Sequence, residues 1–290
     1  MKSLSMKITD YLKYLKEQEK SASTRRQYHK DILNFLDYFG TTPASKDLVI
    51  NYKEILQLSY RPASVNTKLA AINGFLEFAG RPELKVRLLK IQHRPYCPGD
   101  RMLTKAEYLR LVKASESRKN ERLSLLLQTL CSTGIRVSEL AFITAEAVKT
   151  GEAVVRLKGK TRIVLIPGKM KRKLSLYIKK QEIQSGPVFL TRGGRPLDRS
   201  NIWKMMKSLC TDAHVDPEKV FPHNLRHLFA RCFYSIDKDL AKLADILGHS
   251  DINTTRIYII STGKEHLRRL DTLDLVVSKI KKHHVILITW

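Results

Sequence analysis

Acidic residues are scarce in this 290-residue chain, which has 28 of them against 53 lysines and arginines. The formal net charge at pH 7 is +25. Because each neutralised phosphate releases condensed counterions, an excess of this size favours a polyanionic partner such as a nucleic acid. A lysine-rich solvated surface is the alternative interpretation of the same composition.

Long apolar runs and paired cysteines are also missing. No stretch approaches the roughly 18 apolar residues of a bilayer span, and the N-terminal MKSLSMKITDYLKYLKEQEK lacks the apolar centre of a signal peptide. We therefore expect a cytoplasmic, nucleoid-associated protein without a membrane partner. The four cysteines form no CxxC pair, so we expect reduced thiols. They are Cys97, Cys131, Cys210 and Cys232.

The first 80 residues show a helical pattern with clear boundaries. Apolar residues recur at helical spacing between positions 21 and 40 and again between 64 and 80. Ser21 and Ser64 are start signals for these helices, and Gly40 and Gly80 are stop signals. Residues 1–80 are therefore predicted to form a small helical bundle.

A basic segment with several prolines follows at residues 81–102. It contains Pro82, Pro95, Pro98 and Gly99. This composition predicts a linker able to lie along a phosphate backbone, with an ordinary solvated loop as the alternative. Residues 103–290 then form a second predicted domain.

The second domain is predicted to be mainly α-helical with a small β-sheet. The apolar run LSLLLQTLC at 123–131 is typical of a buried helix, which Gly134 can end in a left-handed conformation. Two runs rich in β-branched residues flank KGKT and predict a hairpin, and VFLT around Val188 is expected to add a short strand. Further helices are predicted at 169–181, 200–213, 224–234, 240–247 and 253–260.

Six residues of this domain have the chemistry for metal-free attack on a phosphodiester. They are Arg136 in TGIRVSEL, Lys158 in RLKGKTR, His223 and Arg226 in HNLRH, His249 in LGHS and Tyr258 in TTRIYI. Each arginine can present a planar fork to nonbridging phosphate oxygens and neutralise a pentavalent transition state. Glu139, one turn after Arg136, could hold that arginine in place. Taken singly, such arginines are more often surface or ion-paired residues.

The histidines offer proton transfer or phosphate contacts. His223 follows a proline and should lie at a helix start, where it could accept the phenolic proton or bind a phosphate oxygen. His249 could make a second such contact. His223 and His227 also have the H-x3-H spacing of a zinc pair, but no cysteine pair accompanies them. We expect no metal, and we place His227 in support of Arg226.

Tyr258 is the candidate nucleophile among eleven tyrosines. A phenol has a pKa near 10, so it attacks phosphorus well only where a base and cations stabilise the phenolate. Lys158, at the expected hairpin tip, is placed to donate a proton to the departing 5′ oxygen. Lys160 competes for this role, and no cofactor is expected.

The order and wording of these motifs resemble the tyrosine recombinase (phage integrase) family, especially its compact Xer-type members. TGIRVSEL, the hairpin lysine, HNLRH, LGHS and TTRIYI occur in the family's order, and STRRQYHKDILNFLDYF resembles its core-binding domain. The resemblance implies a SAM-like helical core-binding domain followed by a mixed α/β catalytic domain. It also implies a pocket made of the six residues above, with Tyr258 as nucleophile.

The same resemblance implies a site-specific recombinase that cleaves and rejoins DNA through a 3′-phosphotyrosyl link and a Holliday junction. Duplex DNA and a homotetramer of two dimers are the expected partners, and the free protein is expected to be a monomer or weak oligomer. No accessory protein is identified. Arg25, Lys68 and Lys160 are candidate DNA contacts. Integration or excision, inversion and dimer resolution all use this chemistry; a type IB topoisomerase and an inactive DNA-binding protein are the alternative interpretations.

The C-terminal segment contains a candidate interaction helix. Its apolar stripe consists of Leu270, Leu273, Val277 and Ile280. In similar recombinases a terminal helix docks on the neighbouring protomer, and docking on its own domain is the alternative. An added strand is one interpretation of the final HHVILITW.

Overall fold

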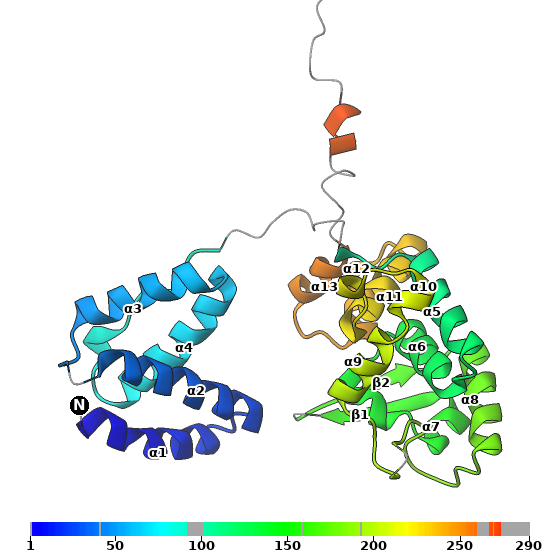
Figure 1. Cartoon of the computed structure of the whole chain (residues 1–290), viewed down its shortest axis with the longest axis horizontal. Helices are drawn as coiled ribbons and strands as arrows, with labels where there is room; N and C mark the ends of the chain where they lie inside the picture. Colours follow the sequence, from blue (N-terminus) through cyan, green and yellow to red (C-terminus); the bar gives the residue numbers. More distant parts are fainter. Residues whose placement is uncertain are drawn as a thin grey trace, which may run out of the picture. The chain divides into compact units, whose positions relative to one another are not determined.

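The chain forms two compact units, Met1–His93 and Arg94–Trp290 (Figure 1). The computed structural model describes residues 2–40, 42–91, 101–157, 159–191, 193–259, 267–268 and 270–273. Helices dominate both units, and one two-stranded sheet lies in the second. The predicted fold class, mainly α with a small sheet, is therefore confirmed. Within the described ranges, no helix is long and apolar enough to cross a membrane.

The first unit is a bundle of four helices. They are α1 (Lys2–Glu17), α2 (Ala22–Phe39), α3 (Lys46–Ser59) and α4 (Pro62–Phe78). The α2 and α4 stripes predicted from the sequence meet in the core, where Phe35, Ile32, Leu69 and Phe75 are fully buried. Apolar residues at helical spacing thus form the inner face of the bundle.

The boundaries of these helices agree with the sequence signals at three of four positions. The Ser21 side chain accepts a hydrogen bond from Thr24 N and begins α2, and Gly40 ends it with φ +54. Gly80 follows α4 with φ +76. The prediction for Ser64 was wrong, because α4 begins two residues earlier at Pro62, which suits the first turn since it needs no N–H partner there.

Residues 81–91, predicted to begin a linker, pack against the bundle instead. Asn73 on α4 donates to Val86 O at 2.8 Å and accepts from Val86 N at 3.0 Å. Asn66, two turns earlier, makes the same pair of bonds with Leu89 at 2.9 and 2.8 Å. The two asparagine amides therefore satisfy the backbone of an extended segment, and the part of the predicted linker beyond Ile91 lies outside the described residues until Arg101.

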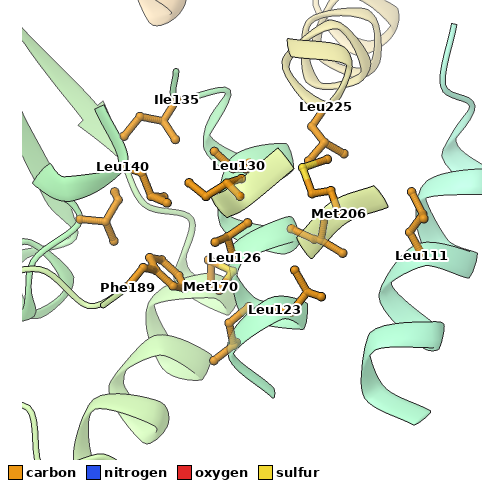
Figure 2. Close-up of a cluster of buried hydrophobic side chains, with 14 of the residues drawn as sticks. Leu111, Leu123, Leu126, Leu130, Ile135, Leu140, Met170, Phe189, Met206 and Leu225 are labelled. Carbon is orange, nitrogen blue, oxygen red and sulfur yellow. The ribbon is translucent and has the colours of Figure 1, made fainter. Parts of the chain in front are cut away.

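The second unit is built around α6. Its helices are α5 (Lys105–Ser117), α6 (Glu121–Thr133), η3 (Val137–Phe142), α7 (Ala145–Thr150), α8 (Gly168–Lys180), α9 (Arg199–Lys207), α10 (Cys210–Ala213), η4 (Pro217–Lys219), α11 (Pro222–Ile236), α12 (Leu240–Leu247) and α13 (Ile252–Ile259). Figure 2 shows Leu123, Leu126 and Leu130 of α6 among side chains from α5, α8, α9 and α11. The apolar run predicted as a buried helix is therefore the centre of this core.

A hairpin of β1 (Glu152–Leu157) and β2 (Lys160–Leu165) forms the sheet. Leu157 pairs with Lys160, so the turn between the strands consists of two residues. The second of them, Gly159, has φ +72, and Lys158 lies outside the described residues. The strand expected around Val188 was wrong: Pro187 and Leu190 make only isolated bridges, to Thr144 and Pro196.

Little of the predicted interaction helix is described. Leu270 and Leu273 are exposed, with 60% and 57% of their surface accessible. Val277, Ile280 and the HHVILITW end lie outside the described residues.

Candidate active site

Arg226 lies inside the second unit, with 1% of its surface exposed. Its Nη1 donates to Gly134 O at 2.6 Å and its Nη2 to Leu247 O at 2.7 Å. Both carbonyls stand at helix C-termini, those of α6 and α12, where backbone acceptors lack helical partners and the helix dipole is negative. Two helix ends therefore solvate one buried cation.

Both of these helices end at a glycine, which turns the chain so that the last carbonyls face the guanidinium. Gly134 ends α6 with φ +60, as predicted, and Gly248 ends α12 with φ +65. Either position also lacks room for a side chain: a Cβ would lie 2.4 Å from Phe229 at Gly134 and 2.3 Å from Arg162 at Gly248. The glycines of the TGIR and LGHS motifs are thus required by backbone conformation and by space.

Burial, with the charge of Arg136, lowers the pKa of Arg226 to about 10. The guanidinium remains charged at neutral pH. Its Nε has no hydrogen-bond partner among the described residues. A buried cation that is not fully paired favours an incoming anion.

Arg136 lies on the chain between α6 and η3, and 37% of its side chain is exposed. The predicted ion pair with Glu139 forms, because Nη1 donates to Oε1 at 2.9 Å. The other carboxylate oxygen accepts from the Arg136 backbone N at 2.9 Å. Nη2 donates to Gly248 O at 3.4 Å, so the α12 terminus contacts both arginines of the predicted pocket.

The side chain of Glu139 is 4% exposed and also pairs with a second arginine, which sequence reasoning missed. Arg162 on β2 donates from Nη2 to Glu139 Oε2 at 2.5 Å. Burial raises the pKa of Glu139, but the hydrogen bonds from Arg162 and Arg136 outweigh this effect and hold the pKa below its ordinary value. The signal in the sequence was a charge on the inward face of an amphipathic strand, in phase with buried Val164 and Ile166.

His249, which follows the Gly248 turn, has a fixed tautomer. Its Nε2 lies 2.8 Å from Arg226 Nη2, and a guanidinium can only donate, so Nε2 accepts. Nδ1 therefore carries the proton and donates to Thr255 Oγ1 at 2.7 Å. Burial and the charges of Arg226 and Arg136 lower the pKa of His249 to about 4, so the ring is neutral.

Tyr258 on α13 packs against His249 and Arg226. Its ring stacks on His249 with a centroid separation of 5.5 Å and an interplanar angle of 11°. The Arg226 Cζ lies 5.9 Å from the ring centroid, and the tyrosine is only 4% exposed. Figure 1 shows α13 beside α11 and α12, which carry the other groups.

His223 and His227 lie on the first two turns of α11, as the proline before His223 predicted. His223 Nε2 is 3.5 Å from Tyr258 Oη, and partial burial with the charges of Arg226 and Arg136 lowers its pKa. His227 packs edge-on against His223 at 4.8 Å and against the Tyr258 ring at 4.4 Å. No hydrogen bond joins His227 to Arg226 within the described part of the chain, but the charge of Arg226 contributes to the lowered pKa of His227, so its support of Arg226 stays a prediction.

An open cleft of about 440 Å³ lies at the start of α11. Arg136, His223 and Arg226 line it, together with two residues that the sequence did not single out, Arg199 and Trp203 of α9. The charge of Arg199 contributes to the lowered pKa of His223. The cleft is therefore lined with cations and suits an anionic group.

The remaining candidates are not brought to this pocket by described contacts. Lys158 is outside the described residues, and Lys160 is described only as a backbone position of β2. In the first unit, Lys68 pairs with the buried carboxylate of Asp31 at 2.7 Å, and its contact with DNA stays a prediction. Arg25 is half-buried, and its Nε has no partner among the described residues.

Comparisons with known proteins agree with this arrangement. Residues 101–265 match the phage integrase family, and residues 8–83 match the N-terminal SAM-like domain of phage integrases. The tyrosine recombinase XerA of Pyrococcus furiosus is 27% identical over 281 residues, 94% of this chain and 96% of that protein. The tyrosine recombinase XerD of Halalkalibacterium halodurans is 28% identical over 287 residues, 89% of this chain and 94% of that protein.

The fold is similar to solved structures of lambda integrase. A dimer of residues 75–356 bound to a COC′ core site gives a TM-score of 0.71 at 17% identity, covering 95% of this chain and 98% of that one. A tetramer bound to a Holliday junction gives 0.70 at 18% identity, covering 88% and 76%. The chain belongs to the phage integrase family, and it is a tyrosine recombinase, an enzyme that cleaves and rejoins DNA.

We predict that His227 makes stability depend on pH. Burial and the neighbouring His223 lower the pKa of His227 from 6.5 to about 4. As pH falls from 6.5 toward 4, the unfolded chain binds a proton there that the folded chain does not, so the free energy of unfolding decreases. His227→Gln should flatten this dependence between pH 6.5 and 5.

Urea unfolding followed by tryptophan fluorescence measures this effect. Trp203 lies on α9 of the second unit, so its signal reports on the unit that contains His227. His29→Gln in the first unit is the matched control and should leave the slope unchanged. An equal slope in His227→Gln and the wild type would contradict the prediction.

Proposed function

We propose that this chain recombines DNA at specific sites, with Tyr258 as the nucleophile. The observation that carries the proposal is the position of the Tyr258 ring, 5.9 Å from the buried guanidinium of Arg226 and between His223 and His249. The Tyr258 oxygen attacks the scissile phosphorus, and the bond from phosphorus to the 5′ oxygen breaks. A 3′-phosphotyrosyl link forms, and a 5′ hydroxyl leaves.

Strand exchange reverses the same step with a different hydroxyl. The 5′ hydroxyl of a partner duplex attacks the phosphotyrosine, which restores a phosphodiester and frees the phenol. One exchanged pair of strands gives a Holliday junction, and a second exchange resolves it. Because the phosphotyrosine retains the bond energy of the phosphodiester, no nucleoside triphosphate is consumed.

Each group around Tyr258 supplies one part of this chemistry. Arg136 and Arg226 neutralise charge on the nonbridging oxygens of the transition state. His223 Nε2, already 3.5 Å from the phenolic oxygen, accepts the phenolic proton because its lowered pKa keeps it neutral. His249 is neutral too, so it acts as a hydrogen-bonding group that orients Arg226.

Oligomers on duplex DNA are the proposed assembly. The similar lambda integrase structures are a dimer on a core site and a tetramer on a Holliday junction. A net charge of +25 supports a DNA partner, and most of the affinity should come from phosphate contacts that weaken with salt. We propose a homotetramer made of two dimers, acting on DNA in the cytoplasm, with Arg25 among its DNA contacts.

Tyr258→Phe should abolish the covalent protein–DNA adduct. A nicked suicide duplex carrying the recombination site loses the short 5′-hydroxyl fragment after cleavage, which traps the phosphotyrosyl link for detection on a denaturing gel. The wild type and the control Tyr234→Phe, whose ring lies in the same apolar cluster, should form a 3′ adduct.

Two results would contradict this proposal. An adduct of normal yield in Tyr258→Phe would remove Tyr258 as the nucleophile. Relaxation of any supercoiled plasmid, with or without the site, would favour the topoisomerase interpretation over a site-specific recombinase.

A separate substrate tests Lys158 as the general acid. Lys158→Ala should cleave the normal phosphodiester about 10²–10⁴-fold more slowly, the usual contribution of general acid catalysis. A duplex with sulfur as the bridging 5′ atom has a leaving group that needs no proton, so it should restore most of the rate. Rescue of Lys160→Ala instead of Lys158→Ala would assign the role to Lys160.

A further inference from the structure

We propose that Arg162 is a positioning residue that sets the distance between the two phosphate-binding sides of the pocket. This inference rests on the proposed function, in which Arg136 contacts the scissile phosphate. Arg162 lies on β2, four residues after Lys158, and reaches both the carboxylate under Arg136 and the turn that carries His249.

The first attachment is a carboxylate shared by two arginines. Glu139 Oε1 accepts from Arg136 Nη1 at 2.9 Å, and its Oε2 accepts from Arg162 Nη2 at 2.5 Å. Arg162 Nε adds a longer contact of 3.4 Å to Oε1. Because Arg162 holds both oxygens, it fixes the plane of the carboxylate and thus the direction in which Arg136 is pulled.

The second attachment is to the end of α12. Arg162 Nη1 donates to Ile246 O at 3.0 Å. Its aliphatic stem passes so close to Gly248 that a Cβ there would lie 2.3 Å from Arg162 Cδ. His249 follows directly and bonds Arg226 at 2.8 Å, so the position of this turn sets the position of the histidine.

The side chain of Arg162 is largely buried, so its charge depends on these contacts. Only 13% of its side chain is exposed, although it belongs to a hairpin whose alternate residues Ile163 and Leu165 are 54% and 63% exposed. Desolvating a guanidinium is costly unless it is paired. Here one side chain pairs with a buried acid of η3 and with a helix-end carbonyl of α12.

Arg162 therefore acts through other groups and makes no phosphate contact of its own in this arrangement. Its loss frees Glu139 to rotate and lets the α12 turn shift, so Arg136 and His249 no longer share one fixed geometry. Misplacement of a reacting group by about 1 Å can cost roughly 10²-fold in rate. We expect Arg162→Ala to slow single-turnover cleavage of the suicide duplex by a factor of this order, with unchanged DNA affinity.

A methylphosphonate at the scissile position separates positioning from general damage. This substrate replaces one nonbridging oxygen with a neutral methyl group, so the transition state carries less charge for Arg136 to neutralise. The rate penalty of Arg162→Ala should fall from about 10²-fold on the phosphodiester to below about tenfold on the methylphosphonate. Because one protein preparation is used for both substrates, any loss of folded protein cancels in the ratio.

Two further variants complete the experiment. Arg162→Lys keeps the charge but loses the fork, so it should recover only part of the phosphodiester rate. Arg172→Ala, which removes an exposed arginine of α8, should match the wild type on both substrates.

Three outcomes would overturn the inference. They are an equal penalty on both substrates, rescue by a 5′-bridging sulfur but not by methylphosphonate, and an Arg162→Ala variant as fast as the wild type. By contrast, failure of the wild type to form any adduct would contradict the proposed function itself.

Discussion

The solvation of one buried guanidinium by two helix ends is the constraint around which the catalytic unit is organised. Arg226 donates to Gly134 O of the α6 end and to Leu247 O of the α12 end, and each helix ends in a glycine with positive φ. The same two turns lead directly into Arg136 and His249. Holding Arg226 therefore also sets the places of the other groups that would contact the phosphate.

The side chains around this pocket carry more positive than negative charge. Arg136 and Arg162 pair with the buried carboxylate of Glu139, whereas Arg226 donates to the backbone carbonyls of Gly134 and Leu247. Burial, together with the positive charges of Arg226 and Arg136, lowers the pKa values of His223 and His249. An entering phosphate would offset the positive charge of the arginines, so the pocket is electrostatically suited to this substrate.

Much of this arrangement was predictable because it depends on local chain chemistry. The apolar run of α6, the left-handed turn at Gly134, the KGKT hairpin and the helix start at His223 all follow from periodicity, glycine conformation or proline. The motifs singled out Arg136, His223, Arg226, His249 and Tyr258, which the structure brings together, and the chain's family confirms that class of enzyme.

The sequence did not predict partners that come together only across the fold. The ion pair of Lys68 with Asp31 depends on how α2 meets α4. The docking of residues 81–91 depends on two asparagines of α4 that no local pattern connects to them. Arg162 was overlooked because its partners are 23 and 84 residues away in the chain.

The stability of Arg226→Lys tests most directly whether the helix ends are held by this arginine. Lysine keeps the charge, but a single ammonium cannot reach Gly134 O, Leu247 O and His249 together. The free energy of unfolding, measured by tryptophan fluorescence in urea with Arg172→Lys as control, should fall by about 2 kcal/mol or more, the cost of leaving buried acceptors without donors. An Arg226→Lys variant as stable as the wild type would contradict this view of the pocket.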